Sequence, residues 1–389
     1  MSSAGRPSLL ILAFSPLRSD ARVLRQLRLL CTRYAVTTVG YGPAPHGAGI
    51  ELAGHHRIPD DIVAWHKDRR RVLLRRYQAA YDTAPVIRHL RSALTPGQWD
   101  VVLANDVETV PLALSLGPGG VHADLHEYAP RQNEESWRWR WFVAPFQRWL
   151  VRTHVTRVDS VSTVGAELAR EYAREFGIPA AVVVNAAPYA DRSPQPVHDP
   201  LRLVHSGLAR RNRSLEVMLD AVRETTRSLT LDLYLMPNDP AYLAELRERV
   251  ADLPQIRFHD PVPPEALGDQ LAECDLGVFV LPPLTFNYRF TLPNKLFDFV
   301  QARLGVLVGP SPEMAALVRE HRLGMVLDDF STPSLTHALD SVTDEQVVAF
   351  KAASHAVAGE LSAQRQVQGW AQAIDALAER PRVTMTDPL

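Results

Sequence analysis

Short apolar runs alternate with helical patterns along this chain, and the alternation occurs in two successive sets. The runs have the length of single buried strands, and the segments between them carry apolar residues at helical spacing. Strands that alternate with helices form parallel sheets, so the pattern predicts an α/β architecture. The expected strands are 8–14, 35–40, 100–105, 121–125, 160–164 and 180–185 in the first set, and 201–207, 229–236, 255–260, 275–281 and 305–309 in the second.

The two sets of strands predict two Rossmann-like domains, and 389 residues are enough for two cores. We expect an N-terminal domain at 1–190, a C-terminal domain at 200–355, and a final helix at 360–382 that packs back on the N-terminal domain. Residues 187–200 are rich in proline and poor in apolar residues, which indicates an interdomain linker. Because open α/β sheets bind ligands beyond the carboxyl ends of their strands, two such domains facing each other would enclose a cleft.

The charge balance argues against a nucleic-acid-binding protein, since the net charge is −2. Residues 1–195 hold 24 Arg and Lys against 18 Asp and Glu, whereas 196–389 hold 18 against 26. The apolar run at 9–14 is short and no cleavage motif follows it, so a first strand is favoured over a signal peptide. Two cysteines in apolar helical contexts suit buried thiols. These features together favour a cytoplasmic protein.

The segment 290–309 reads as a helix followed by a strand, and the helix opens with a lysine. Thr291 is a candidate cap, Pro293 suits the first turn, and Gly305 suits the stop. A helix N-terminus is the positive end of the dipole, so Lys295 is unfavourable there unless an anion binds. Helical spacing places Asp298 one turn further on, where its carboxylate suits neighbouring sugar hydroxyls. The pattern favours a nucleotide site; the alternative is a solvated surface lysine.

A second strand–loop–helix segment also gathers cations before a helix. Gly207 permits a tight turn after the strand, and Arg210, Arg211 and Arg213 follow it. The next helix places Leu215, Met218, Leu219 and Val222 inward. Two sites of this kind in one domain strengthen the phosphate interpretation.

Polar residues also follow strands of the first domain. His126 and Glu127 come after one strand, and Asp106 after another. A histidine at such a place is either structural or catalytic, and Asp106 is an alternative cap for the helix that follows. Arg22 lies on a helix whose inward positions are Val23, Leu24, Leu27 and Leu30; it is either an anion or acceptor contact or part of a solvated arginine face.

Five segments, in this order, resemble the family 4-like retaining glycosyltransferases, also called glycosyl transferases group 1. They are "SDARVLRQLRLL", "ANDVETVPLAL", "DLHEY", "SGLARRNRSLEVMLDAV" and "LPNKLFDFVQARLGVLVG", and the resemblance covers roughly residues 8 to 325. It implies the GT-B fold, an α/β arrangement of two facing Rossmann-like domains with a cleft between them.

The resemblance also implies an activity, the transfer of a hexose-type sugar from a nucleotide-diphosphate sugar to an acceptor hydroxyl with retention at the anomeric carbon. It implies no cofactor and no metal in the chemistry, and the chain has no Asp-x-Asp motif. The N-terminal domain would be the acceptor side.

The resemblance assigns roles residue by residue. Arg213 and Lys295 would hold the donor diphosphate, the backbone near Asn294 would add N–H donors, and Asp298 would bind the ribose. His126 would contact the transferred sugar. The remaining members of the expected site are Gly207, Arg210 and Thr291 on the donor side, and Arg22, Asp106 and Glu127 on the acceptor side.

The chain departs from the family pattern at three positions. Phe290 stands where the family usually has a glutamate that contacts the donor sugar, and Leu208 stands where an arginine is usual. Asp298 stands where the usual residue is a glutamate, which is one methylene longer. Two other functions therefore stay open, a GT-B sugar-nucleotide epimerase and a non-catalytic nucleotide-sugar-binding protein. The acceptor is not identified, although the arginine-rich composition suggests a high-GC bacterium, with a cell-envelope glycan precursor or a secondary metabolite as acceptor.

A peripheral membrane contact is a further hypothesis. Residues 136–157 carry four tryptophans, Trp137, Trp139, Trp141 and Trp149, among five arginines, and residues 66–77 add a second basic face. Aromatic and cationic side chains suit an anionic lipid surface. The alternative is that the tryptophans pack in the core and the arginines are solvated.

Overall fold

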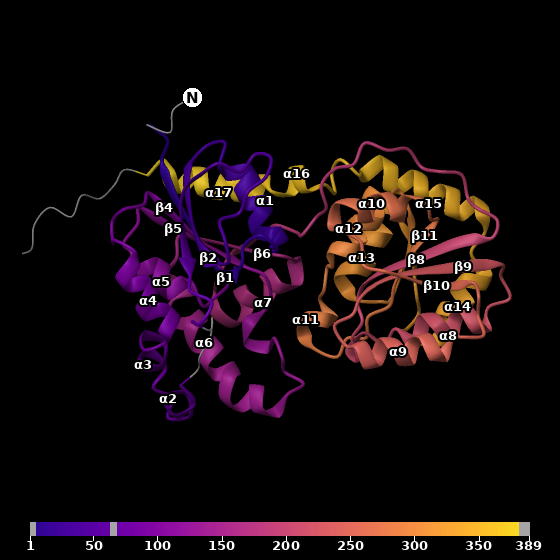
Figure 1. The fold of residues 1–389 in the computed structure, drawn as a ribbon, viewed down its shortest axis with the longest axis horizontal. Helices are drawn as coiled ribbons and strands as arrows, with labels where there is room; N and C mark the ends of the chain where they lie inside the picture. The colour runs from indigo at the N-terminus through magenta and orange to yellow at the C-terminus, as the bar shows by residue number, and fades with distance from the viewer. Residues whose placement is uncertain (1–4, 63–67, 381–389) are drawn as a thin grey trace, which may run out of the picture. The chain divides into compact units, whose positions relative to one another are not determined.

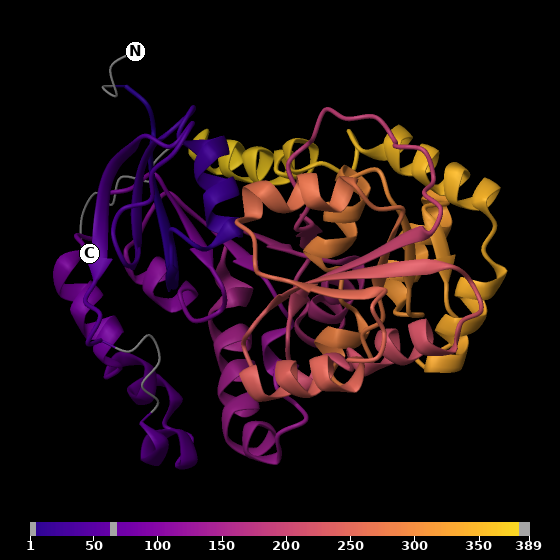
Figure 2. The same ribbon diagram turned by 45° about the vertical axis from the view of Figure 1, so that its right-hand side comes forward.

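The structure, a computed structural model, describes residues 5–62 and 68–380. The chain forms two compact units. The first runs to Val184 and takes up the chain again from Val367, and the second is Asn185–Gln366. Each unit is a parallel sheet with helices on its faces (Figures 1 and 2).

The first unit is built on a seven-stranded parallel sheet of order β3-β2-β1-β4-β5-β6-β7. Its strands are β1 (Ser8–Pro16), β2 (Ala35–Tyr41), β3 (Leu52–Ile58), β4 (Val101–Asn105), β5 (Gly120–Leu125), β6 (Ser160–Thr163) and β7 (Ala180–Val182). Its α-helices are α1 (Ala21–Leu30), α2 (Arg69–Leu73), α3 (Tyr77–Asp82), α4 (Pro85–Ala93), α5 (Val110–Ser115), α6 (Ala144–Thr153), α7 (Ala166–Phe176) and α17 (Gln368–Ala378). A π-helical turn, Trp139–Val143, directly precedes α6.

The second unit is built on a six-stranded parallel sheet of order β10-β9-β8-β11-β12-β13. Its strands are β8 (Leu201–Leu208), β9 (Leu229–Met236), β10 (Ile256–His259), β11 (Leu276–Phe279), β12 (Gly305–Val308) and β13 (Gly324–Val326). Its α-helices are α8 (Glu216–Glu224), α9 (Pro240–Arg249), α10 (Pro264–Ala272), α11 (Phe286–Arg289), α12 (Asn294–Gln301), α13 (Pro312–His321), α14 (Thr332–Ser341), α15 (Asp344–Val357) and α16 (Ala363–Gln366). In Figure 1, α8, α9 and α14 lie on one side of the strands, and α10, α12 and α15 lie on the other.

The α/β prediction with two Rossmann-like sheets is confirmed, and every strand expected from an apolar run is present. Two strands were missed, β3 and β13, and both lie at a sheet edge. An edge strand is less buried than a central strand, so fewer of its residues have to be apolar. The sequence of β3, LAGHHRI, is accordingly polar, and β13 has only three residues, so neither produces an apolar run.

The proline-rich segment 187–200 has no regular secondary structure, but it is not a loose tether. The buried guanidinium of Arg303 donates to the carbonyl of Ala190 at 2.6 Å, and Arg192 pairs with Asp269 at 2.8 Å. These contacts hold the segment against the second unit, and the change from one unit to the other falls at Val184 and Asn185.

The expected C-terminal helix is divided into α16 and α17, and α17 packs on the first unit beside α1, β4 and β5 (Figure 1). Its Trp370 is fully buried, and the guanidinium of Arg22 lies 4.6 Å from the centre of the indole. Residues 381–382, the end of the predicted helix, lie outside the described residues.

A buried ion pair ties α15 to the sheet of the second unit. The ammonium group of Lys351 lies 2.9 Å from a carboxylate oxygen of Asp275, and both side chains are shielded from solvent. The same carboxylate accepts from the backbone N–H of Arg202 at 3.0 Å. Asp275 therefore joins the start of β8, the start of β11 and α15.

We predict that Lys351→Met lowers the free energy of unfolding by about 3–5 kcal/mol, because it leaves the Asp275 carboxylate buried without its cation. The double variant Lys351→Met/Asp275→Asn should recover part of that loss, since no unpaired charge then remains. Urea denaturation followed by circular dichroism measures both. An unfolding midpoint equal to that of the wild type in the single variant would contradict the prediction.

Candidate functional site

Both sheets carry polar residues where the strand order reverses. In the first unit the reversal lies between β1 and β4, and in the second between β8 and β11. Ligands of open α/β sheets bind at such points, beyond the carboxyl ends of the strands. The two units therefore each contribute one cluster.

The first turn of α12 places Lys295 against the end of β8. The cap of this helix is Pro293, and the side chain of Thr291 makes no capping hydrogen bond, so the expected cap was wrong. A Cβ atom added to Gly207 would lie 2.5 Å from Cε of Lys295. Gly207 is thus required for the lysine stem to pass over the backbone.

The charge of Lys295 is poorly compensated. Its pKa is lowered to about 8, chiefly because the group is buried and also because of the nearby charge of Arg213, while Asp298 opposes the shift. In the described part of the chain, neither Lys295 nor Arg213 has a carboxylate within ion-pair distance; their close partners are the rings of Phe279 and Tyr288. The charge of Arg213 thus disfavours the charged form of Lys295, and an anion bound between the two side chains would favour it.

Arg213 is held by an aromatic residue rather than by an acid. It ends a 3-10 turn, Arg211–Arg213, and its guanidinium lies 4.9 Å from the centre of the Tyr288 ring. Its Nε atom is buried and has no hydrogen-bond partner. The Tyr288 hydroxyl accepts from Asn212 at 3.0 Å, which fixes the ring under the arginine.

His205 completes this cluster, and the sequence analysis did not identify it. Its Nδ1 donates to the carbonyl of Val278 at 2.8 Å, which leaves Nε2 as an acceptor next to Gly207. The pKa of His205 is lowered to about 3, chiefly by burial and also by the charge of Lys295. The imidazole is therefore neutral, and the cluster contains two cations rather than three. A histidine inside an otherwise apolar strand was the available signal.

The other donor-side predictions fall around this cluster but not in it. The cluster borders a small cavity of about 10 Å³, which is lined by Lys295, Arg213, His205 and five apolar residues. Arg210 is exposed, and Arg211 pairs with Glu245 at 2.6 Å. Thr291, Asn294 and Asp298 do not line the cavity. The cavity has room for about one water molecule, so a nucleotide must bind across its mouth or move the surrounding loops apart.

The helix stop was placed too late in the sequence analysis. Helix α12 ends at Gln301 with Ala302 as its cap, and Arg303 follows with a φ angle of 65°. Gly305 instead begins β12, where an added Cβ atom would lie 2.6 Å from Leu276.

In the first unit, His126 follows β5 and lies between two carboxylates. Its Nδ1 is 3.6 Å from Asp106 and its Nε2 is 3.7 Å from Asp124. Burial alone would lower the pKa of His126, but the neighbouring carboxylates of Asp106 and Asp124 outweigh burial and raise it. Asp106 does not cap α5 with its side chain; instead the carboxylate accepts from the backbone N–H of His126 at 3.3 Å.

Arg22 does not face a ligand. Its guanidinium donates to both carboxylate oxygens of Asp124, at 2.6 and 2.5 Å, and its side chain is 3% exposed. It also donates to the carbonyl of Val183 at 3.0 Å. The expectation of a solvated or acceptor-facing arginine was wrong, because the guanidinium points inward and pairs with the buried carboxylate of Asp124 on β5.

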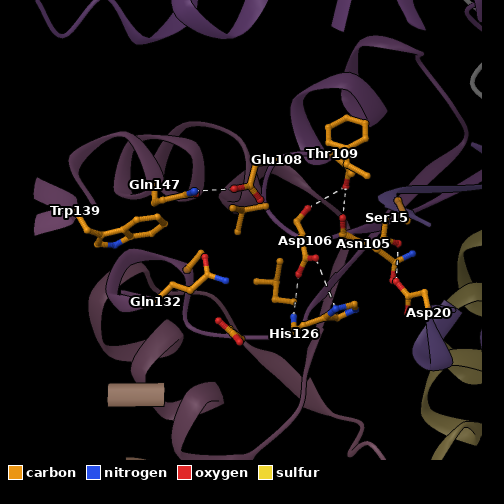
Figure 3. A pocket seen from close by; sticks show the side chains of 16 residues that line it. Ser15, Asp20, Asn105, Asp106, Glu108, Thr109, His126, Gln132, Trp139 and Gln147 are labelled. Carbon is orange, nitrogen blue, oxygen red and sulfur yellow. Dashed lines mark hydrogen bonds and ion pairs between the residues drawn. The ribbon is translucent and has the colours of Figure 1, made fainter. Parts of the chain in front are cut away.

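A cavity of about 430 Å³ lies in front of His126. Figure 3 shows Trp139, Gln132 and Gln147 along one side of it and Ser15 and Asp20 on the other, with His126 and Asp106 between them. Its polar lining residues are Ser15, Asp20, Asn105, Asp106, Glu108, Thr109, His126, Glu127, Gln132, Trp139 and Gln147. Among the described residues, neither a lysine nor an arginine lines it. Gln147 is buried, and its Nε2 donates to Glu108 at 2.6 Å, while its Oε1 has no hydrogen-bond partner.

Of the site residues expected in the first unit, the structure brings His126 and the acceptor-side residues Asp106 and Glu127 together in this cavity, and Arg22 does not line it. Within the described residues, no group of three or more His, Cys, Asp and Glu side chains is placed to hold a metal ion.

Comparisons with solved structures identify the fold. No protein-family model matches the sequence, and no curated protein matches it. HepE from Anabaena, solved in complex with UDP, superposes with a TM-score of 0.66 at 12% identity and covers 95% of this chain and 100% of its own. The chain has the GT-B fold.

Two further GT-B structures agree. A glycosyltransferase from Rickettsia africae has a TM-score of 0.68 at 11% identity, over 97% of this chain and 100% of that one. Sucrose-phosphate synthase from Thermosynechococcus elongatus has a TM-score of 0.69 at 10% identity, over 95% of this chain and 100% of that one. At these identities the likeness establishes the GT-B architecture, and the chemistry has to be argued from the two clusters.

We predict that the imidazole of His126 titrates above its ordinary pKa, and that Asp106→Asn lowers that pKa because it removes one flanking charge. A two-dimensional NMR titration of the histidine ring protons measures this, with the resonance assigned by its loss in His126→Gln. An unchanged pKa in Asp106→Asn would contradict the geometry.

We predict that Lys295→Met raises the melting temperature of the ligand-free protein at pH 7 by a few degrees. Because the pKa of Lys295 is lowered to about 8, the folded state binds fewer protons than the unfolded state between there and 10.5. The charged lysine therefore lowers the free energy of unfolding by its full amount below about pH 8, and this destabilisation disappears as the pH rises toward 10.5.

Thermal unfolding in phosphate-free buffer at several pH values measures this difference. The gap between variant and wild type should be widest below pH 8 and close as the pH rises. A variant that melts below the wild type at pH 7 would show that the ammonium group stabilises the fold, and would contradict an empty anion site.

Proposed function

We propose that this protein is a retaining glycosyltransferase of the family 4-like group, which transfers a hexose-type sugar from a nucleotide-diphosphate sugar to an acceptor hydroxyl. The observation that carries the proposal is the pair Lys295 and Arg213 at the strand-order reversal of the second unit, two cations that have no carboxylate within ion-pair distance among the described residues. A bound anion would supply the missing negative charge. In open α/β sheets, nucleotides bind at this position, beyond the carboxyl ends of the strands, so we propose a nucleoside diphosphate as the anion.

The same two cations supply the chemistry of the leaving group. As the bond between the sugar and the diphosphate breaks, negative charge grows on the diphosphate oxygen. Preorganised cations at that place stabilise the transition state more than the ground state. The N–H groups of the first turn of α12, which begins at Asn294, add to this stabilisation. With two cations in this role, we propose that the reaction proceeds without a metal ion or other cofactor.

The His126 cavity supports an acceptor with several hydroxyl groups. Its volume of about 430 Å³ suits a small ligand, and carboxylates and amides line it. We propose that His126 contacts the transferred sugar and that Asp106 and Glu127 contact the acceptor. In a retaining reaction of this family, the leaving phosphate can take the acceptor's proton, so no protein nucleophile is assigned. We also propose a cytoplasmic location.

The remaining donor contacts follow from the resemblance. We propose that Asp298 binds the ribose hydroxyls and that Arg210 and Thr291 lie along the donor. Phe290, which replaces the usual glutamate, packs against Phe286 with ring centres 4.7 Å apart. That contact favours a non-catalytic nucleotide-sugar-binding protein as the second candidate function, because the usual sugar contact at this position is missing.

A donor and acceptor assay separates the candidates. We expect free nucleotide to appear only when a nucleotide-sugar donor and a hydroxyl acceptor are both present, with chelator leaving the rate unchanged. Chromatography of the nucleotides measures this. Interconversion of the donor without acceptor would identify an epimerase, and binding of the donor without turnover would identify the non-catalytic protein.

We predict that Lys295→Met and Arg213→Ala each lower kcat/KM by roughly 10²-fold or more, since each removes part of the charge that meets the leaving diphosphate. Their effects should not be additive, because both act on one group. Arg211→Ala is the matched control from the same 3-10 turn; its guanidinium pairs with Glu245, so its activity should stay close to that of the wild type. Equal losses in all three variants would contradict the assigned clamp.

A further inference from the structure

Exposed apolar side chains gather on two segments of the first unit. They belong to α2 with the residue after it, and to the stretch around the π-helical turn: Leu73, Leu74, Trp137, Trp141 and Phe142, which are 61, 65, 55, 73 and 39% exposed. Most large apolar side chains of a soluble protein that are this exposed stand singly. Five exposed apolar side chains on two segments form an apolar surface patch whose exposure to water is unfavourable.

The two segments lie side by side. Helix α2 contacts the π-helical turn, and Leu73, Trp137 and Phe142 line one groove of about 860 Å³. In Figure 1, helix α2 lies at one end of the first unit, and α17 runs along the opposite end. We call this groove and its exposed rim the Trp–Leu surface.

Arginines surround the Trp–Leu surface. Five of them are exposed, Arg70, Arg75, Arg76, Arg138 and Arg140. Within the described residues these five have no carboxylate partner, whereas their neighbours Arg71 and Arg131 pair with Asp68 and Glu134. The guanidinium of Arg138 lies 5.5 Å from the centre of the Trp137 indole. The surface therefore combines an apolar centre with a net positive rim.

We propose that the Trp–Leu surface docks the first unit on an anionic lipid bilayer. Indole rings partition to the level of the headgroups, leucine side chains enter the boundary with the acyl chains, and arginines pair with lipid phosphates. Each arginine near an anionic membrane adds to the attraction, so five arginines without a carboxylate partner among the described residues strengthen the binding together. In the described residues no helix has the length and apolar character needed to cross a bilayer. The contact is peripheral.

The tryptophans of this region do not all behave alike, which sharpens the proposal. Trp149 packs against Tyr77 and Phe146, with ring centres 5.8 and 5.7 Å away, as the core interpretation expected. Trp137 and Trp141 do not, so the core interpretation is wrong for them. Residues 66 and 67 of the predicted basic face lie outside the described residues.

A protein partner or a second copy of the chain is the competing occupant of an apolar groove. The arginine rim argues against a second copy of the chain, because a self-contact would bring like charges together. An anionic bilayer instead satisfies the apolar centre and the whole rim at once. The proposal does not depend on the transferase reaction, and its test needs no turnover.

Sedimentation with lipid vesicles tests the proposal. We expect the full chain to bind vesicles of phosphatidylcholine with about 30 mol% phosphatidylglycerol at least about tenfold more strongly than vesicles of phosphatidylcholine alone, at about 0.05 M salt. Salt at about 0.5 M should weaken the binding, because the Debye length falls. Equal binding to both vesicles, or no binding to either, would overturn the proposal.

Variants locate the contact. Leu74→Ser/Trp141→Ser and Arg138→Gln/Arg140→Gln should each reduce binding at least about tenfold while the melting temperature stays unchanged, since these side chains are exposed. The matched control, Met236→Ser/Val348→Ser, changes two side chains of the second unit that are 49 and 56% exposed and should bind as the wild type does.

Light scattering after size exclusion distinguishes a self-contact. A monomer whose state does not change in Leu74→Ser/Trp141→Ser supports the membrane as occupant. The proposal would be overturned if the wild type formed an oligomer that dissociates in this variant. It would also be overturned if the variant still bound anionic vesicles as the wild type does.

Discussion

The buried ion pair between Arg22 and Asp124 organises the first unit. Asp124 accepts both guanidinium contacts and also hydrogen bonds from Gln26 and Ser162, at 2.8 and 2.5 Å. Arg22 in turn reaches the chain at Val183 and the indole of Trp370. One charge pair thus joins α1, β5, β6, the end of the sheet and the returning helix α17. A buried pair of this kind costs desolvation and is tolerated because every lone pair is satisfied.

His126 depends on this arrangement. Its Nε2 atom faces the same Asp124 carboxylate, whose pKa the charge of Arg22 keeps far below its ordinary value in spite of burial. The carboxylate therefore stays ionised and favours a protonated imidazole. The second unit is built on the opposite principle, because Lys295 and Arg213 lack such a counter-charge. The charges of the first cluster compensate each other within the protein, whereas those of the second would be compensated by the anion that we propose as its ligand.

The sequence predicted the parts of the structure that a local pattern determines. Central strands produce apolar runs, and the expected interior of α8, with Leu215 and Met218, is buried as the helical period required. Lys295 could be found because it opposes the dipole of its own helix. By contrast, the inward turn of Arg22 depends on Asp124, 102 residues away, and the helical period alone assigns an arginine to solvent. His205 is hidden for the same reason, since its partner Val278 lies 73 residues away.

One side chain belongs to two cavities. The indole of Trp139 lines both the polar cavity in front of His126 and the groove of the Trp–Leu surface. It is also the first residue of the π-helical turn, a kind of distortion that recurs where helices serve function. A ligand in either cavity that displaced this ring would change the wall of the other cavity as well. If it did, the two binding free energies would be coupled, and each ligand would change the affinity for the other by the same factor.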